Sequence, residues 1–141
     1  MGQQPITFEQ VAALQAPPPG HVIPYGSEPR QFGHLRLPTG DGPHRVIVFV
    51  HGGCYRASFT IAHAGAVEQA LADAGYAVWS LEYRSVGDPG GAWPGAFQDV
   101  ARGVDHLRVL ASQYPLDLSR RSEEHTSELQ SPCNLVCRLL L

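Results

Sequence analysis

The residue types best suited to chemistry occur together near the middle of the chain. The apolar run VIVFV is followed directly by the motif HGGCY, which comprises His51, Gly52, Gly53, Cys54 and Tyr55. Glycines let a backbone turn tightly and approach a ligand, and fixed N–H donors stabilise the negative charge that develops on a carbonyl oxygen during acyl transfer. We therefore predict an oxyanion hole in which Gly53 and Cys54 donate backbone N–H groups, while His51 and Gly52 support the loop.

Other interpretations of this motif remain open. It could be a structural turn without a ligand, or Gly52 and Gly53 could bind an anion at the N-terminus of the following helix in a non-catalytic α/β module. The sequence has no G-x-G-x-x-G motif and no P-loop lysine, which counts against phosphate binding. Cys54 is disfavoured as a nucleophile because no His or Asp partner is fixed beside it in the sequence.

Aromatic residues near the motif are candidate substrate contacts. Tyr55 and Trp93 could line a substrate pocket, although Trp93 is equally expected to fill a gap in the core. Tyr83 and Arg84 are expected to brace the loop. Five further histidines are scattered without metal-ligand spacing and are expected on the surface, so we predict neither a metal nor a cofactor. These histidines are His21, His34, His44, His63 and His106.

The elements expected to position the motif alternate between strands and helices. A half-exposed edge hairpin at residues 21–37 precedes residues 45–50, whose β-branched side chains indicate a strand buried on both faces. Helical spacing of apolar residues over 61–74, and again after Pro94, flanks a further strand at 76–81. This order predicts an α/β fold in which a mostly parallel sheet carries helices on both faces.

Composition and charge exclude several classes of protein. A chain of 141 residues that is 43% hydrophobic and 16% charged is typical of one globular domain. A formal net charge of -3 without a long basic run argues against nucleic acid or an anionic membrane as a partner. The N-terminus lacks the basic and apolar regions of a signal peptide, so we expect a cytoplasmic protein.

Three motifs follow one another in a characteristic order. The HGGCY motif comes first, a strand ending in Glu82-Tyr83-Arg84 comes next, and the loop PGGAWP then leads into a helix that contains Asp99. Over roughly residues 20–120 this order resembles the N-terminal half of an α/β-hydrolase, and it is most similar to the esterase and arylformamidase-like branch with an HGG-x-W/Y loop. The resemblance implies a truncated α/β-hydrolase fold, with its first four strands and two helices, and an oxyanion hole after the third strand.

The same resemblance implies a function and shows what is missing for it. It implies a serine hydrolase that acts on a small-molecule ester or amide, with carboxylic esters or related acyl bonds, aryl formamides included, as substrates. The nucleophile of this fold lies in a G-x-S-x-G motif and is followed by an acid and a His, but no serine here has glycine two before and two after it. We therefore predict that the chain is a fragment that is inactive alone.

The segment after Arg120 explains this loss. Its sequence, RSEEHTSELQS, has neither strand nor helix periodicity, and its codons can be written as a nucleotide string that resembles an adapter used in sequencing libraries. A genuine solvated tail is the alternative. We expect residues 1–20 to be a lead-in with a short helix, 21–120 a partial hydrolase domain, and 121–141 an artefactual or disordered tail. Without further strands, residues 46–50 would form an exposed, aggregation-prone edge.

Overall fold

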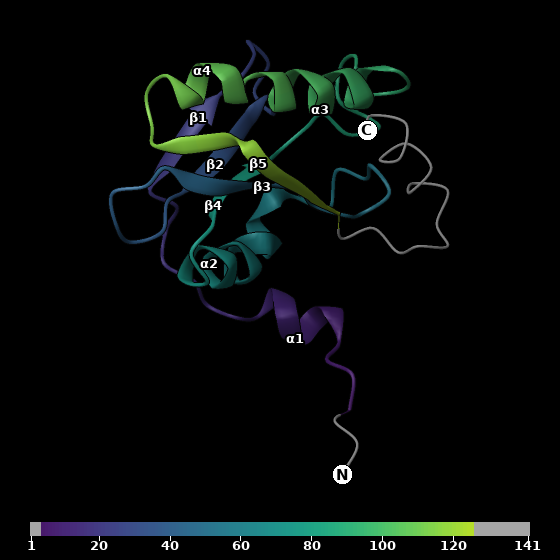
Figure 1. The fold of residues 1–141 in the computed structure, drawn as a ribbon. Coiled ribbons are helices and arrows are strands. Elements are labelled where there is room, and N and C mark those ends of the chain that lie inside the picture. Colours follow the sequence, from purple (N-terminus) through teal and green to yellow (C-terminus); the bar gives the residue numbers. More distant parts are fainter. Residues whose placement is uncertain (1–3, 126–141) are drawn as a thin grey trace.

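The chain forms a five-stranded sheet covered by helices. The computed structural model describes residues 4–125, and of residues 120–125 it describes the backbone (Figure 1). In sequence, the strands are β1 (His21–Pro24), β2 (Phe32–Arg36), β3 (His44–Val50), β4 (Ala77–Leu81) and β5 (Leu116–His125). Their order across the sheet is β1-β2-β4-β3-β5, which places β3 and β4 in the interior of the sheet.

The sheet is mixed, which corrects the prediction of a mostly parallel sheet. Strands β1 and β2 are antiparallel, as are β2 and β4, whereas β3 runs parallel to both β4 and β5. The connection from β1 to β2 is too short for the crossover that parallel neighbours require, so it forms a hairpin. Parallel pairing begins only at β3, after which a helix separates successive strands.

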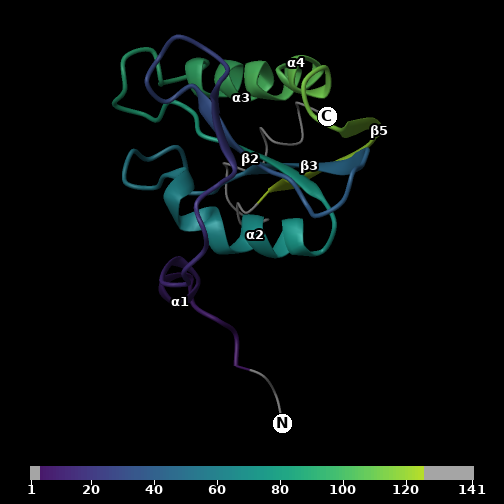
Figure 2. The same ribbon diagram turned by 90° about the vertical axis from the view of Figure 1, so that its left-hand side faces the viewer.

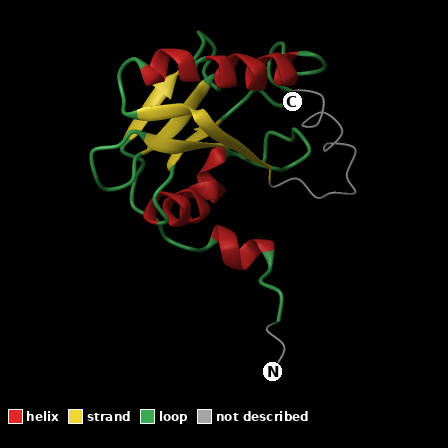
Figure 3. Cartoon of the chain, viewed as in Figure 1, coloured by secondary structure: helices red, strands yellow, loops and turns green. Residues whose placement is uncertain are grey.

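Helices lie on both faces of the sheet, as the sequence predicts. After the short α1 (Phe8–Ala12), the 3-10 helix η1 (Ile61–Ala64) leads into α2 (Gly65–Asp73), and α3 (Gly95–Asp105) is followed by α4 (Leu107–Ala111). Helix α2 covers one face, while α3 and α4 cover the other (Figures 2 and 3). Within residues 4–125, no helix is both long and apolar enough to cross a membrane.

The alternation of side chains along β3 divides the core between the two faces. Val46, Val48 and Val50 belong to the cluster that contains residues of α3 and α4, whereas Phe49 belongs to the cluster that contains residues of α2. Because successive side chains of a strand point to opposite faces, an unbroken apolar run is required wherever both faces are covered. This confirms the prediction of a strand buried on both faces for residues 46–50, whereas Arg45 is exposed.

Strand β5 continues beyond the domain boundary expected at Arg120. Residues 121–125 pair in parallel with residues 46–50 of β3, so β3 is not the exposed edge that the sequence suggested. Hydrogen bonds of a ladder join backbone groups, so a strand can add to an unpaired edge without the side-chain alternation that would reveal it in the sequence. The rest of the predicted tail, residues 126–141, lies outside the described residues.

Candidate functional site

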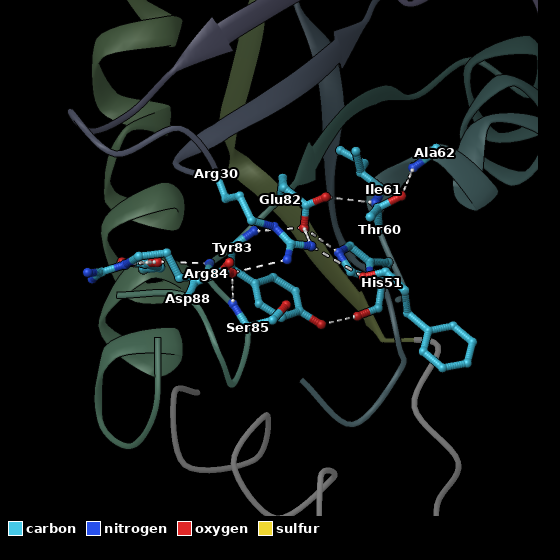
Figure 4. Close-up of polar contacts among 12 residues, drawn as sticks. Arg30, His51, Thr60, Ile61, Ala62, Glu82, Tyr83, Arg84, Ser85 and Asp88 are labelled. Atoms are coloured by element: carbon cyan, nitrogen blue, oxygen red, sulfur yellow. Dashed lines mark hydrogen bonds and ion pairs between the residues drawn. The ribbon is translucent and has the colours of Figure 1, made fainter. Parts of the chain in front are cut away.

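The site begins where two parallel strands end side by side. Val50 of β3 is paired with Leu81 of β4, so His51 and Glu82 leave the sheet at the same point of the same edge. Nε2 of His51 lies 2.8 Å from Oε1 of Glu82 (Figure 4). The carboxyl ends of parallel strands are the usual place for a binding crevice in α/β proteins.

The glycine turn that follows β3 has an unusual backbone. Gly53, Cys54 and Tyr55 all have positive φ angles, of 128°, 50° and 59°. The left-handed region costs a non-glycine residue about 1–2 kcal/mol, and such residues are concentrated at functional sites. The turn is closed by a hydrogen bond of 3.0 Å from the Arg56 N–H to the Gly53 carbonyl. A Cβ atom at position 53 would clash with the side chain of Phe59, so only glycine fits there.

His51 holds the start of this turn from inside the protein. Its side chain is 1% exposed, and Nδ1 lies 2.9 Å from the carbonyl oxygen of Gly52. The Tyr83 hydroxyl donates a hydrogen bond of 2.7 Å to the His51 carbonyl, and the two rings stack with their centroids 4.6 Å apart. With both ring nitrogens facing oxygen atoms of the protein, His51 is placed to support the loop and not to reach a substrate.

Glu82 joins the turn to two other segments. Its carboxylate accepts hydrogen bonds of 3.0 Å from the backbone N–H groups of Ile61 and Tyr83, and the Arg30 guanidinium lies 3.5 Å away. Burial alone would raise the pKa of Glu82, but the hydrogen bonds from His51 and from the two backbone N–H groups outweigh it and lower this pKa below its usual value. Glu82 is therefore a buried, ionised anchor (Figure 4).

A second carboxylate anchors the loop after β4. Asp99 on α3 accepts hydrogen bonds from the Arg84 backbone N–H at 3.0 Å, from Arg84 Nη2 at 2.8 Å and from Gln31 Nε2 at 2.7 Å. Burial works against ionisation of Asp99, yet these donors hold its pKa below the usual range. Arg30 also reaches Asp88 at 3.1 Å, which ties this loop to the loop between β1 and β2.

The predicted substrate contacts adjoin this network, since the Tyr55 ring lies with its centroid 5.5 Å from that of Tyr83. The Tyr55 ring meets the Phe97 ring edge to face with centroids 5.1 Å apart, and Trp93 meets Phe97 at 4.7 Å. Trp93 is 77% exposed, so its alternative interpretation as a core residue is wrong. The structure thus brings Tyr55 and Trp93 together through Phe97, while the side chain of Cys54 is exposed.

Sequence reasoning did not single out several residues of the site. Glu82 was only part of a motif, and neither Arg30 nor Phe97 was expected to contribute. A charged residue directly after a buried strand is the signal that could have identified Glu82. No group of three His, Cys, Asp or Glu side chains within residues 4–125 is arranged to hold a metal ion.

A cavity of about 310 Å³ lies beside the glycine turn. Gly52 and Gly53 form part of its wall, together with Phe59, His63 and residues of α1. His63 was expected on the surface, but its ring packs edge to face against His51 at 5.4 Å. Burial, and secondly the neighbouring His51, lower the pKa of His63, which favours its neutral form.

Comparison with known proteins identifies relatives of this arrangement. The model of the BD-FAE family matches residues 35–122. Similar solved structures include a bifunctional GH43-CE protein of Bacteroides eggerthii (28% identity, TM-score 0.62), a truncated carbohydrate esterase from gut microbiota (27%, 0.63) and an arylesterase (19%, 0.67). They cover 73%, 74% and 84% of this chain, which spans only 15%, 37% and 40% of theirs. Comparison with curated proteins gave no match.

Proposed function

The chain belongs to the BD-FAE family, and we propose that it supplies the oxyanion-binding part of a carboxylesterase-like serine hydrolase. The observation that carries this proposal is the turn after β3, where Gly53 and Cys54 hold consecutive left-handed conformations. Their backbone N–H groups are fixed before any substrate binds. Preorganised donors of this kind are typically worth about 2.7–4 kcal/mol each in the transition state of acyl transfer.

The chemistry assigned to the turn is the stabilisation of a tetrahedral intermediate. When a nucleophile attacks the carbonyl carbon of an ester, the carbonyl oxygen gains negative charge and accepts hydrogen bonds from Gly53 and Cys54. Collapse of the intermediate then releases the alcohol. His51 is not the general base in this proposal, because its ring is buried between Glu82 and the Gly52 carbonyl. Carboxylic esters are the proposed substrates, with related acyl bonds such as aryl formamides as further candidates.

The nucleophile, the acid and the catalytic His would come from residues outside these 141. The sequence contains no G-x-S-x-G motif, so we propose that this chain does not hydrolyse esters by itself. The segment that pairs with β3 supports the same view. The strands β3 and β4 beside it are apolar, yet residues 121–125, which form the edge of the sheet next to β3, read RSEEH. We propose that these residues derive from adapter sequence and replace the authentic strand.

The alternative of an anion-binding module has less support. It requires that Gly52 and Gly53 stand at the N-terminus of a helix, because helix N–H groups and the helix dipole attract the anion. In the structure a separate turn follows Gly53, and the next helical segment begins only at Ile61. The carboxylate of Glu82 also accepts the N–H of Ile61, so that donor is not available to an anion.

The test requires the longer protein, obtained by sequencing the source locus beyond codon 120. Hydrolysis of p-nitrophenyl acetate is compared between the Phe59→Gly variant and the Gly53→Ala, Phe59→Gly double variant. The atom nearest to the new methyl group would be Cβ of Phe59, which glycine lacks and alanine would keep. We expect kcat to fall roughly 100- to 1,000-fold in the double variant, with KM nearly unchanged.

A matched control separates this effect from general backbone strain. Gly40 also has a positive φ, of 103°, but a Cβ there would meet nothing within 4 Å, so Gly40→Ala should leave kcat unchanged. The proposal would be contradicted by an equal loss of kcat in the Gly53 and Gly40 variants, or by no loss of kcat in the Gly53 variant. The 141-residue chain itself should release no p-nitrophenol above background.

A further inference from the structure

The cavity beside the glycine turn has the chemical character of a binding site for an uncharged group. Its wall contains no Asp, Glu, Lys or Arg side chain among the described residues, and its one titratable side chain is His63, whose neutral form is favoured by burial. The remaining side chains are mainly aliphatic or aromatic. A ligand that fills such a cavity would bury mainly apolar surface, so an apolar group is the ligand it favours.

Three aromatic rings shape this cavity. Phe8 meets His63 at 5.2 Å and Phe59 at 5.7 Å between ring centroids, and Phe59 meets His63 at 6.2 Å, all in edge-to-face geometry. Edge-to-face packing is the favoured arrangement of aromatic pairs, so the rings hold one another in position. One wall of the cavity is therefore built from the lead-in segment, from Phe59 just before η1 and from His63 within η1.

Phe8 lines this wall without being part of the buried core. Helix α1 has no buried residues, and Phe8 is 49% exposed although it lines the cavity. A Thr7–Gln10 capping box fixes the start of α1, and the Arg36 guanidinium holds the Pro17 carbonyl at 2.8 Å further along the chain. Exposed aromatic surface at the rim of a cavity gains the most when a ligand covers it.

The volume of the cavity limits the size of its ligand. About 310 Å³ is at the small end of ligand sites. A short alkyl chain fits this space, whereas a polymer does not.

We propose that this cavity binds the short apolar chain attached to the substrate carbonyl, and that Phe8 is a residue that determines chain-length specificity. The cavity shares Gly52 and Gly53 with the turn, so a carbonyl oxygen at the turn directs an attached chain toward Phe8 and Phe59. That this apolar group belongs to a substrate rests on the proposed function. That the cavity binds a short alkyl group does not rest on it.

The first experiment measures binding to the 141-residue chain by NMR, with methyl ketones from 2-butanone to 2-nonanone as probes. Ketones carry the carbonyl and the alkyl chain but have no bond to hydrolyse. We expect amide shifts at Gly53 and His63, and a Kd that falls about three- to fourfold per added methylene until the cavity is full. Phe8→Ala should flatten this dependence, while the control Val22→Ala, an exposed residue of β1 (59%), should not.

A second variant keeps the inference testable if Phe8→Ala fails to fold. A second assay shows whether the acyl group or the alcohol of the substrate enters the cavity. Val67→Phe narrows the cavity from α2 and should favour 2-butanone over longer ketones. In the longer protein, a series of p-nitrophenyl esters varies the acyl chain and a series of alkyl acetates varies the alcohol; the series whose kcat/KM responds to Phe8→Ala identifies the chain that enters the cavity.

The outcomes separate this inference from the proposed function. Ketone binding that does not depend on chain length, or that is unchanged by Phe8→Ala and Val67→Phe, would overturn the inference. Ketone binding at the cavity in a longer protein that hydrolyses no ester would support the cavity as a site and overturn the proposed function. If a longer protein hydrolyses esters at a rate that depends neither on the length of the alkyl group nor on Phe8, the proposed function is supported and the inference about the cavity is overturned.

Discussion

Glu82 is the residue on which the position of the glycine turn most directly depends. Its carboxylate accepts two backbone N–H groups and contacts His51, which in turn contacts the Gly52 carbonyl. An amide at this position would keep one oxygen acceptor but would present N–H donors to the Ile61 or Tyr83 N–H. A buried donor left without an acceptor typically costs about 1–3 kcal/mol.

We therefore predict that Glu82→Gln lowers the free energy of unfolding by about 1–3 kcal/mol at pH 7. The pKa of Glu82 is lowered in the folded state, so its stabilisation is complete above the unfolded pKa, about 4.3, and is lost as the pH falls through the folded pKa. The difference in the free energy of unfolding between the parent chain and the variant should therefore decrease as the pH is lowered. Urea unfolding from pH 7 to pH 3 measures it, with the exposed Glu28→Gln as control. If the free energies of unfolding of the parent chain and of Glu82→Gln vary with pH in parallel, Glu82 is not the ionised anchor.

At the scale of elements, the sequence indicated most helices and strands but not how they meet. Apolar periodicity located β3, β4 and α3, because each buries a face whose period matches its element. The register of Val50 with Leu81 is what brings His51 against Glu82, and pairing register leaves no trace in either strand alone. The mixed sheet and the meeting of Tyr55 and Trp93 on Phe97 were missed for the same reason.

The largest effect on stability is expected at the contact between α2 and β2, where a buried ion pair joins the two elements. Nε of Arg36 lies 3.0 Å from Oε2 of Glu68, and the two side chains are 6% and 0% exposed. The neighbouring His34, Ser80 and Arg36 side chains outweigh the effect of burial and lower the pKa of Glu68, which keeps it ionised. Removing one partner of a buried ion pair leaves an uncompensated charge and costs about 3–5 kcal/mol.

We expect Glu68→Leu to destabilise the fold by about 3–5 kcal/mol, as measured by urea unfolding. Replacing both partners, in a Glu68→Leu, Arg36→Leu variant, should recover much of this loss because no buried charge then remains unpaired. Asp73→Ala, a change at an exposed carboxylate of the same helix, is the control and should have little effect. A double variant as unstable as the single one would show that the ion pair does not account for the effect.

For the whole molecule, β5 decides whether the sheet ends in an apolar edge. Residues 46–50 are buried and pair with residues 121–125 on one side and with β4 on the other. The opposite edge of the sheet is the four-residue β1, which is short and contains Pro24, and both features discourage pairing with another chain. The tendency of this protein to self-associate should therefore be controlled by residues 121–125.

A chain shortened to residues 1–120 tests this argument. It keeps the pairs of β5 with His44 and Arg45 but loses all those with residues 46–50, so a long apolar strand is left with unpaired N–H and C=O groups. We predict that it forms larger species in size-exclusion chromatography with light scattering at micromolar concentration. A chain of residues 1–125 is the matched control, since it keeps β5 whole, and it should elute as a smaller species. If both chains elute alike, backbone pairing by residues 121–125 is not what protects β3, and the buried faces of the sheet must suffice.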